Sequence, residues 1–239
     1  MHFHLPSPIH GWRQFSGEVG IIVLGILIAL GAEQVIEGIH DRHVAEQSRR
    51  DVREEVGTDL GFYRGRLADS ACIASRLSEL SKIVESGTVA KGTVLWVGRP
   101  GDFVPFTERW DAVTASARST LFSSAEQGSL DAIYGIFVPM KAESQMEQEA
   151  WTTLNILGHF DGPIDPATRL ALRIAIEQAR RTDAVFNLAG YYALFHAGKM
   201  KIASNPATSP RAEDVHSVCL PIATAPEQAE RLLQPRKAT

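Results

Sequence analysis

The chain lacks several features that would assign it to a protein class directly. Only 2 of its 239 residues are cysteines, and they stand in no Cys-x-x-Cys pair, which excludes a disulfide-rich scaffold and a cysteine-based zinc or redox motif. Lys and Arg number 24 against 28 Asp and Glu, so the formal net charge is -4 and there is no basic excess for a nucleic-acid backbone. We therefore expect no nucleic-acid partner.

Common catalytic and nucleotide-binding motifs are missing as well. The sequence contains no Gly-x-Ser-x-Gly elbow, no Gly-x₄-Gly-Lys-[Ser/Thr] phosphate loop, no Gly-x-Gly-x-x-Gly and no His-Glu-x-x-His. Two Glu-x-x-His pairs occur, at 37–40 and 213–216, but a di-iron site also needs a glutamate from each of two further helices. We therefore predict no metal, no cofactor and no enzymatic activity.

A long apolar run near the N-terminus is the strongest single feature. Residues 19–32 (VGIIVLGILIALGA) carry no polar side chain, but at 1.5 Å per residue they rise only about 21 Å, short of the ~30 Å hydrocarbon core of a bilayer. A span therefore has to use residues 15–39, with Glu18 and Glu33 near the two interfaces. We predict a transmembrane helix over 15–39, after an N-terminal segment 1–14.

Two other interpretations of this run are open at the level of sequence. Ala29-Leu30-Gly31 is a small-x-small sequence of the kind at which signal peptides are cleaved, and the run has the length of a signal-peptide apolar region. Against cleavage, only one Arg precedes the run, and Glu18 stands directly before it. The other interpretation is the buried core helix of a soluble domain, although such helices seldom lack polar residues on every side.

The sequence leaves the orientation across the membrane open. Arg42, Arg49, Arg50 and Arg53 follow the apolar run closely, whereas Arg13 alone precedes it, so the positive-inside rule favours a cytoplasmic C-terminal domain. Long domains nevertheless translocate largely regardless of charge. The cysteines do not decide the matter, because Cys72 and Cys219 could be bridged only in an oxidising compartment and their spacing carries no signal.

Small residues recur at helical spacing within the apolar run. Gly25 and Ala29 stand four residues apart, and Gly31 follows shortly after. Small side chains let two transmembrane helices approach closely, where lipid offers no hydrophobic drive for association. We therefore take these three residues as one half of a candidate helix-packing interface.

A second strip of small residues lies in the polar helix that follows. Gly57, Gly61 and Gly65 stand four apart, and each glycine costs a helix up to about 1 kcal/mol relative to alanine. Close packing against another helix, in the same chain or in a second copy, is a compensating gain. A flexible or broken helix is the alternative at this strip.

The rest of the chain predicts an all-α fold, with the membrane helix continuing into an antiparallel helical bundle over 40–202. Apolar residues recur at steps of three and four from Val52 to Val84. Residues 88–97 (TVAKGTVLWV) are β-branched around Lys91-Gly92, which favours a short β-hairpin or an extended connection.

Capping signals mark where the later helices begin. Thr107 is a candidate N-cap, Ser123 to Glu126 has the pattern of a capping box, and Asp165-Pro166 begins the longest periodic segment. Five prolines after Lys201 predict a mostly irregular tail over 203–239, with one short helix near its end.

Two stretches resemble a broad group of uncharacterised bacterial proteins with one N-terminal transmembrane helix and an α-helical domain. The first is Trp12, then Gly17-Glu18 running into IIVLGILIALGAEQ, and the second is WDAVTASARSTLFSSAEQGSLDAIYGIF (110–137) with EQEAW (147–151). The resemblance covers residues 12–202 in outline. It implies an inner-membrane anchor, with the domain more often outside the cytoplasm, and it brings no activity with it.

These features together predict an accessory or scaffolding subunit of a membrane protein complex. Its expected partners are membrane lipid and other transmembrane helices or a second copy of itself. The alternative is an extracytoplasmic ligand-sensing or binding module, in which the aromatic stretch Phe186–Phe195 lines a pocket between helices.

Overall fold

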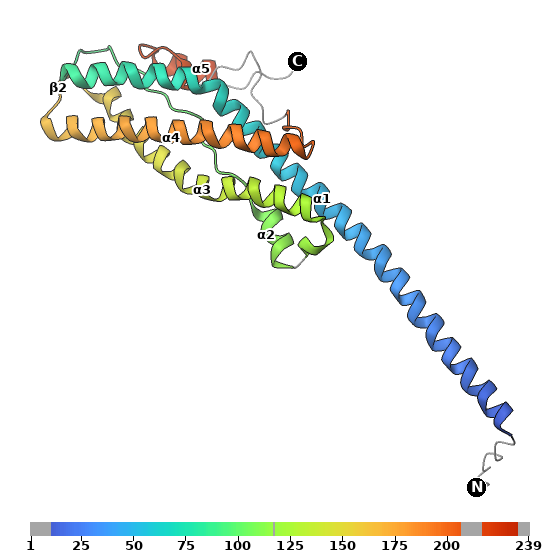
Figure 1. Cartoon of the computed structure of the whole chain (residues 1–239). Helices are drawn as coiled ribbons and strands as arrows, with labels where there is room; N and C mark the ends of the chain where they lie inside the picture. The colour runs from blue at the N-terminus through green and yellow to red at the C-terminus, as the bar shows by residue number, and fades with distance from the viewer. Residues whose placement is uncertain (1–10, 117, 207–216, 234–239) are drawn as a thin grey trace, which may run out of the picture. The chain divides into compact units, whose positions relative to one another are not determined.

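The computed structural model describes residues 11–116, 118–206 and 217–233 (Figure 1). These residues form five α-helices and one two-stranded sheet, which confirms the all-α fold class. The elements are α1 (Trp12–Ser86), β1 (Thr88–Val89), α2 (Glu108–Ala115), α3 (Ser124–Asn155), β2 (Gly162–Pro163), α4 (Pro166–Lys199) and α5 (Pro226–Leu233). Short 3₁₀ turns occupy Arg118–Leu121, Ile156–His159 and Ser217–Cys219.

Helix α1 is unbroken over 75 residues, so the apolar run and the polar helix after it are one element. The chain divides into two units, Met1–Ser48 and Arg49–Thr239, and α1 contributes to both. In the first unit, α1 is long and apolar enough to cross a membrane. Its apolar window of 18 residues has a mean hydropathy of 2.3, and 0% of that window is buried. A core helix of a soluble domain is buried by definition, so that interpretation of the run does not fit this chain.

Three long helices build the second unit, and α4 runs antiparallel to α1. At one end of this pair Arg53 donates a hydrogen bond to the carbonyl of Met200, and at the other end Arg169 donates to the carbonyl of Glu85. Helix α4 also returns antiparallel to α3 after a short loop (Figure 1). Helices α1 and α3 are therefore parallel, and the connection 87–123, which contains α2, has to run back along the bundle.

The small sheet closes the end of the bundle where α1 stops. Strand β1 pairs antiparallel with β2, with Thr88 opposite Pro163 and Val89 opposite Gly162. The extended structure expected near 88–97 is thus present. Its second strand comes from the loop before α4, so the sheet joins the end of α1 to the start of α4.

Two of the three predicted helix starts have the expected caps. The Ser123 side chain accepts the backbone N–H of Glu126 and the Glu126 carboxylate accepts the N–H of Ser123, which is a complete capping box. Asp165 caps α4 by accepting two backbone N–H groups. Thr107 makes no side-chain capping bond, because its hydroxyl donates to the carboxylate of Asp111 instead.

The core of the second unit consists of two apolar clusters that follow one another along the bundle. Each takes side chains from α1, α3 and α4, and full burial of one large apolar side chain is worth about 1.5–3 kcal/mol. The first cluster includes Val56, Leu60, Tyr63, Ile133, Phe137 and Phe186, and the second includes Ile73, Leu77, Trp151, Leu154, Leu172 and Ile176. On each helix, a buried charged or polar residue falls between the two clusters.

The described residues beyond 202 are irregular apart from a 3₁₀ turn and α5, and they pack on the same unit. Val218 and Leu220 are buried, and Ala229 of α5 is 0% exposed. The backbone N–H groups of Leu95 and Trp96 both donate to the carbonyl of Ile222. Helix α5 does form where a short helix was predicted. Residues 207–216 and 234–239 of the predicted tail lie outside the described residues.

Candidate functional site

The predicted packing residues of the apolar segment are all exposed. Gly25, Ala29 and Gly31 lie on the surface of α1, and a Cβ atom added at Gly25 or Gly31 would meet no described atom within 4 Å outside its own helix turn. Their surface is therefore open to another helix or to lipid, and the packing role stays a prediction.

The second glycine strip faces the interior of its own unit. Gly57 and Gly61 are buried and Gly65 is half-buried. The N–H of Asn205 donates to the carbonyl of Gly57 at 2.6 Å, and a Cβ atom at Gly57 would lie 3.0 Å from the carbonyl oxygen of Ala203. The absence of a side chain at Gly57 thus allows the segment that follows α4 to pack closely on α1. Because α1 is continuous here, the alternative of a broken helix is wrong. The strip is not a free surface for a second copy.

Gly190, to which the sequence assigned no packing role, makes a close contact between α1 and α4. A Cβ atom at Gly190 would lie 3.1 Å from Tyr63 Cδ1 and 3.4 Å from Leu67 Cδ1. A glycine inside a helix costs about 1 kcal/mol of stability relative to alanine. A glycine within the longest periodic segment was therefore the available sequence signal for a close contact.

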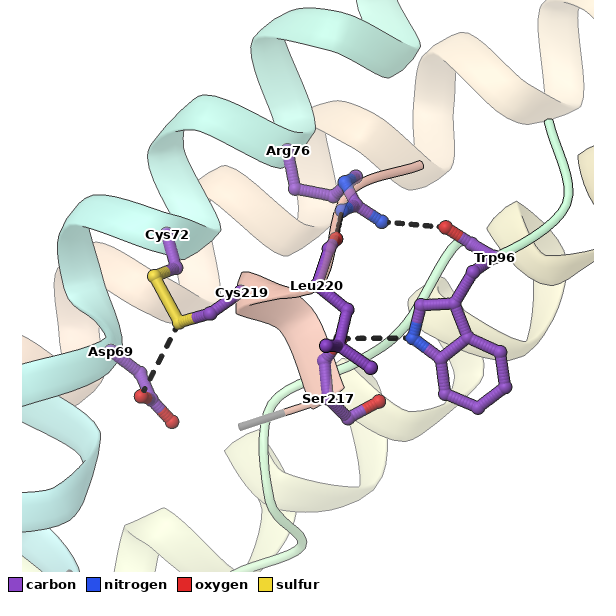
Figure 2. The surroundings of a disulfide bond; sticks show 7 residues. All are labelled: Asp69, Cys72, Arg76, Trp96, Ser217, Cys219 and Leu220. Carbon is purple, nitrogen blue, oxygen red and sulfur yellow. Dashed lines mark hydrogen bonds between the residues drawn. A yellow bond between two sulfur atoms is a disulfide. The ribbon is translucent and has the colours of Figure 1, made fainter. Parts of the chain in front are cut away.

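A disulfide joins the C-terminal segment to α1 (Figure 2). Cys72 of α1 and Cys219 of the 3₁₀ turn are bonded across a sequence separation of 147 residues, with their Cα atoms 5.0 Å apart. The carboxylate of Asp69, one turn before Cys72, lies 4.0 Å from Cys219 Sγ. Cys219 is exposed, so the bond lies at the surface.

Arg76, one turn beyond Cys72, organises the backbone around this bond. Its guanidinium donates to the carbonyls of Trp96, Val97 and Leu220, while its side chain is only 3% exposed. The Trp96 indole N–H donates to the carbonyl of Ser217 at 2.9 Å, as Figure 2 shows. A cavity of about 280 Å³ lies beside the disulfide. One buried cation thus ties together α1, the connection after β1 and the C-terminal segment.

A buried ionic layer separates the two apolar clusters. The guanidinium of Arg66 on α1 donates to Glu147 of α3 and, at 3.1 Å, to Asp183 of α4, with its side chain 4% exposed. It also lies over the ring of Phe186, 5.2 Å from the centroid. Burial raises the pKa of both Glu147 and Asp183, and the nearby guanidinium opposes that shift. Both bonds come from Nη2 of Arg66, whereas its Nε and Nη1 are buried without a hydrogen-bond partner among the described residues. The layer joins three helices at one level of the bundle.

Two carboxylates enter the first apolar cluster from α1. Glu55 accepts the phenol O–H of Tyr134 at 2.6 Å and the backbone N–H of Arg109 at 2.8 Å. Asp59 is 0% exposed and accepts the N–H of Phe106. Burial raises the pKa of Asp59 to about 8, so this carboxyl is mostly protonated at neutral pH. A cavity of about 240 Å³ lies beside Glu55.

The raised pKa of Asp59 predicts a pH-dependent stability. Because that pKa is about 8 in the folded chain against an ordinary 3.8, the folded state binds the proton more tightly than the unfolded state. The free energy of unfolding should therefore be largest below about pH 4 and fall towards pH 8, by up to about 1.4 kcal/mol per pH unit. Asp59→Asn keeps an acceptor for Phe106 and removes the titration, so it should flatten this fall and stabilise the protein at about pH 8.

Urea unfolding in detergent, followed by circular dichroism at several pH values, measures this effect. Asp131→Asn, on the exposed face of α3, is the matched control and should leave the pH profile of the wild type unchanged. The prediction is contradicted if Asp59→Asn and the wild type lose stability in parallel as the pH rises.

The remaining predicted features do not assemble into a site. Within the described ranges no group of three or more His, Cys, Asp or Glu side chains is placed to hold a metal ion, and the pair at 213–216 lies outside those ranges. The aromatic stretch of α4 is divided between core and surface. Phe186 is buried, whereas Tyr191 and Phe195 are exposed, and none of them lines the cavity beside the disulfide or the one beside Glu55.

No protein-family model, curated protein or solved structure matches the chain.

Proposed function

We propose that the chain is a single-pass protein of the bacterial inner membrane that acts as an accessory or scaffolding subunit of a membrane protein complex. The observation that carries this proposal is the apolar part of α1, which is long enough to span and of which 0% is buried. An apolar helix surface of this length needs lipid or another helix as its environment. The resemblance described above supports the same location.

The disulfide supports a periplasmic domain. Structural disulfides persist in oxidising compartments such as the periplasm and are rare in the cytosol, where thiols are kept reduced. The bond between Cys72 and Cys219 lies in the second unit, on the C-terminal side of the apolar segment. This argument outweighs the arginines after the segment, because the positive-inside rule is weak for anchors that precede a long translocated domain.

The apolar segment supplies the surface for a partner helix in this proposal. Gly25 and Ala29 lie on one face of α1, four residues apart and exposed. Packing of a second transmembrane helix there gains van der Waals contact that larger side chains would prevent. The partner is another membrane protein or a second copy of the chain.

A substitution in the apolar segment tests the scaffolding role. Gly25→Leu should reduce, by about tenfold or more, the amount of a cross-linked complex recovered from native membranes, since about 1.4 kcal/mol of lost packing suffices for a factor of ten. Cross-linking followed by gentle detergent extraction and mass spectrometry measures the complex. The intact mass of the extracted chain also reports whether residues 1–31 are retained, as an anchor requires.

Gly20→Leu is the matched control. Gly20 lies in the same segment with no described atom near its added Cβ, and five residues place it about 140° around the helix from Gly25. Gly20 lies on the side of Gly31, so the two variants compare the face of Gly25 and Ala29 with the face of Gly31. A complex that is equally abundant in both variants, or a chain that lacks residues 1–31 in the membrane, overturns the proposal.

A further inference from the structure

Helix α4 carries an aromatic stripe on its outer surface. The stripe consists of Leu188, Tyr191, Tyr192 and Phe195, which are 58%, 67%, 53% and 58% exposed. These positions repeat at steps of three and four, so they share one side of the helix. Four large side chains exposed to this extent present on the order of 400 Å² of apolar surface, the size of the largest apolar patch on a typical monomer, which is often functional.

Core packing does not explain these residues. The inner side of the same turns is already filled by Phe186, Ala189 and Ala193, which belong to the first apolar cluster. The outer side of a helix in a soluble domain is ordinarily polar. The stripe is therefore a second apolar face on a helix that needs only one for its fold.

The charged side chains along this part of α4 and just beyond it are all positive. Between residues 184 and 203 the only charged side chains are Lys199 and Lys201, with no Asp or Glu. The ammonium of Lys199 lies over the ring of Phe195, 4.3 Å from the centroid. The nearest acidic residue along α4, Asp183, is turned inward to Arg66. The stripe thus ends in two cations that no acidic residue of this stretch neutralises.

The stripe lies near the end of the second unit that holds Arg53, close to where that unit begins in the sequence. Close to the end of α4, Arg53 donates to the carbonyl of Met200, and beyond it Asn205 donates to the carbonyl of Gly57. In the sequence, 14 residues separate Arg53 from Ile39, the last residue of the proposed span, and a chain of that length reaches about 50 Å at most. The length of the connecting chain alone therefore allows this end of the unit to reach the membrane surface when Ile39 is anchored there.

We infer that the aromatic stripe with Lys199 and Lys201 binds the surface of the membrane in which the chain is anchored, through anionic phospholipid. Tyrosine and phenylalanine place an apolar ring at the headgroup level, and neighbouring lysines contact anionic headgroups, which adds about 1 kcal/mol for each cation near the surface. A dimer is the weaker assignment, because the stripe offers about half of the ~800 Å² per partner that a stable complex buries. The inference rests on the proposed membrane anchoring.

Photo-crosslinking to lipid tests the inference on the full chain. The protein is reconstituted in nanodiscs that contain phosphatidylglycerol and a phospholipid with a photoreactive group near its headgroup, and adducts are mapped by mass spectrometry. We expect adducts on residues 188–195 as well as on 15–39. The variant Tyr191→Ser/Tyr192→Ser/Phe195→Ser should reduce the former about fivefold or more and leave the latter unchanged.

Two further variants separate lipid binding from general effects of substitution. Leu170→Ser/Ile174→Ser removes exposed apolar side chains from the other end of α4, where the exposed fractions are 59% and 58%, and should leave the adducts on 188–195 unchanged. Lys199→Glu/Lys201→Glu keeps every apolar residue and should reduce those adducts in phosphatidylglycerol discs but not in pure phosphatidylcholine discs. Because the lysine variant changes only exposed charge, it remains informative even if the serine variant fails to fold.

Each outcome has one meaning. Adducts on 15–39 without adducts on 188–195 overturn the inference and leave the anchoring proposal in place. Adducts on neither range contradict the anchoring itself. Cross-links between the stripes of two copies overturn the lipid assignment in favour of a second copy of the chain.

Discussion

Reduction of the bond between Cys72 and Cys219 is expected to lower the free energy of unfolding of the second unit by about 2–5 kcal/mol. The bond closes a loop with a sequence separation of 147 residues, and the chain-entropy model assigns about 5 kcal/mol to a loop of that size. Because the contacts of Arg76 remain after reduction, we expect a shifted transition rather than an unfolded protein. Residues 217–233 should lose the most protection.

Thermal unfolding with and without dithiothreitol, together with hydrogen exchange of residues 217–233, measures this loss. The variant Cys72→Ser/Cys219→Ser should resemble the reduced wild type and should not respond to the reductant. A wild type whose melting temperature is insensitive to dithiothreitol contradicts the prediction. Free thiols that react with a maleimide in unreduced native membranes would also count against a periplasmic domain, since the bond is expected to be formed there.

Arg66→Met is expected to destabilise the second unit by about 3–5 kcal/mol, because it leaves Glu147 and Asp183 buried without their cation. The effect should depend on pH. Burial already raises the pKa of both carboxyl groups, and removal of the guanidinium raises it further. Groups with a raised folded pKa lose stability as the pH rises through that value, so the defect of Arg66→Met should be smallest in acid and grow towards neutral pH.

Chemical unfolding of two companion variants shows whether the charge imbalance is the cause. Arg66→Met/Glu147→Met replaces an ion pair by apolar side chains and should recover part of the loss, since a buried pair is often exchangeable for apolar packing. Arg64→Met lies two residues away on the exposed side of α1 and should change stability by no more than about 0.5 kcal/mol. A double variant as unstable as Arg66→Met alone, or a defect independent of pH, speaks against this role of the ionic layer.

Local patterns predicted the helices well. Apolar residues that recur at steps of three and four positions located α1, α3 and α4. The capping signals at Ser123 and Asp165 marked where α3 and α4 begin. Thr107 failed as a cap because its hydroxyl bonds to Asp111 and Lys141, and the position of Lys141 on α3 cannot be inferred from residues near Thr107. The glycine strip was recognised as a packing feature, but its partner was not.

The sequence by itself determined the helical class, the apolar segment able to span a membrane and most helix starts, because these depend on side chains at most a few residues apart. Only the tertiary structure decided which groups meet across more than 70 residues: Cys72 with Cys219, Arg66 with Glu147 and Asp183, and Gly57 with the chain after α4. A lone cysteine, arginine or glycine in a helix carries no local sign of its partner. Its role is set when parallel α1 and α3 and antiparallel α4 bring distant residues to the same level.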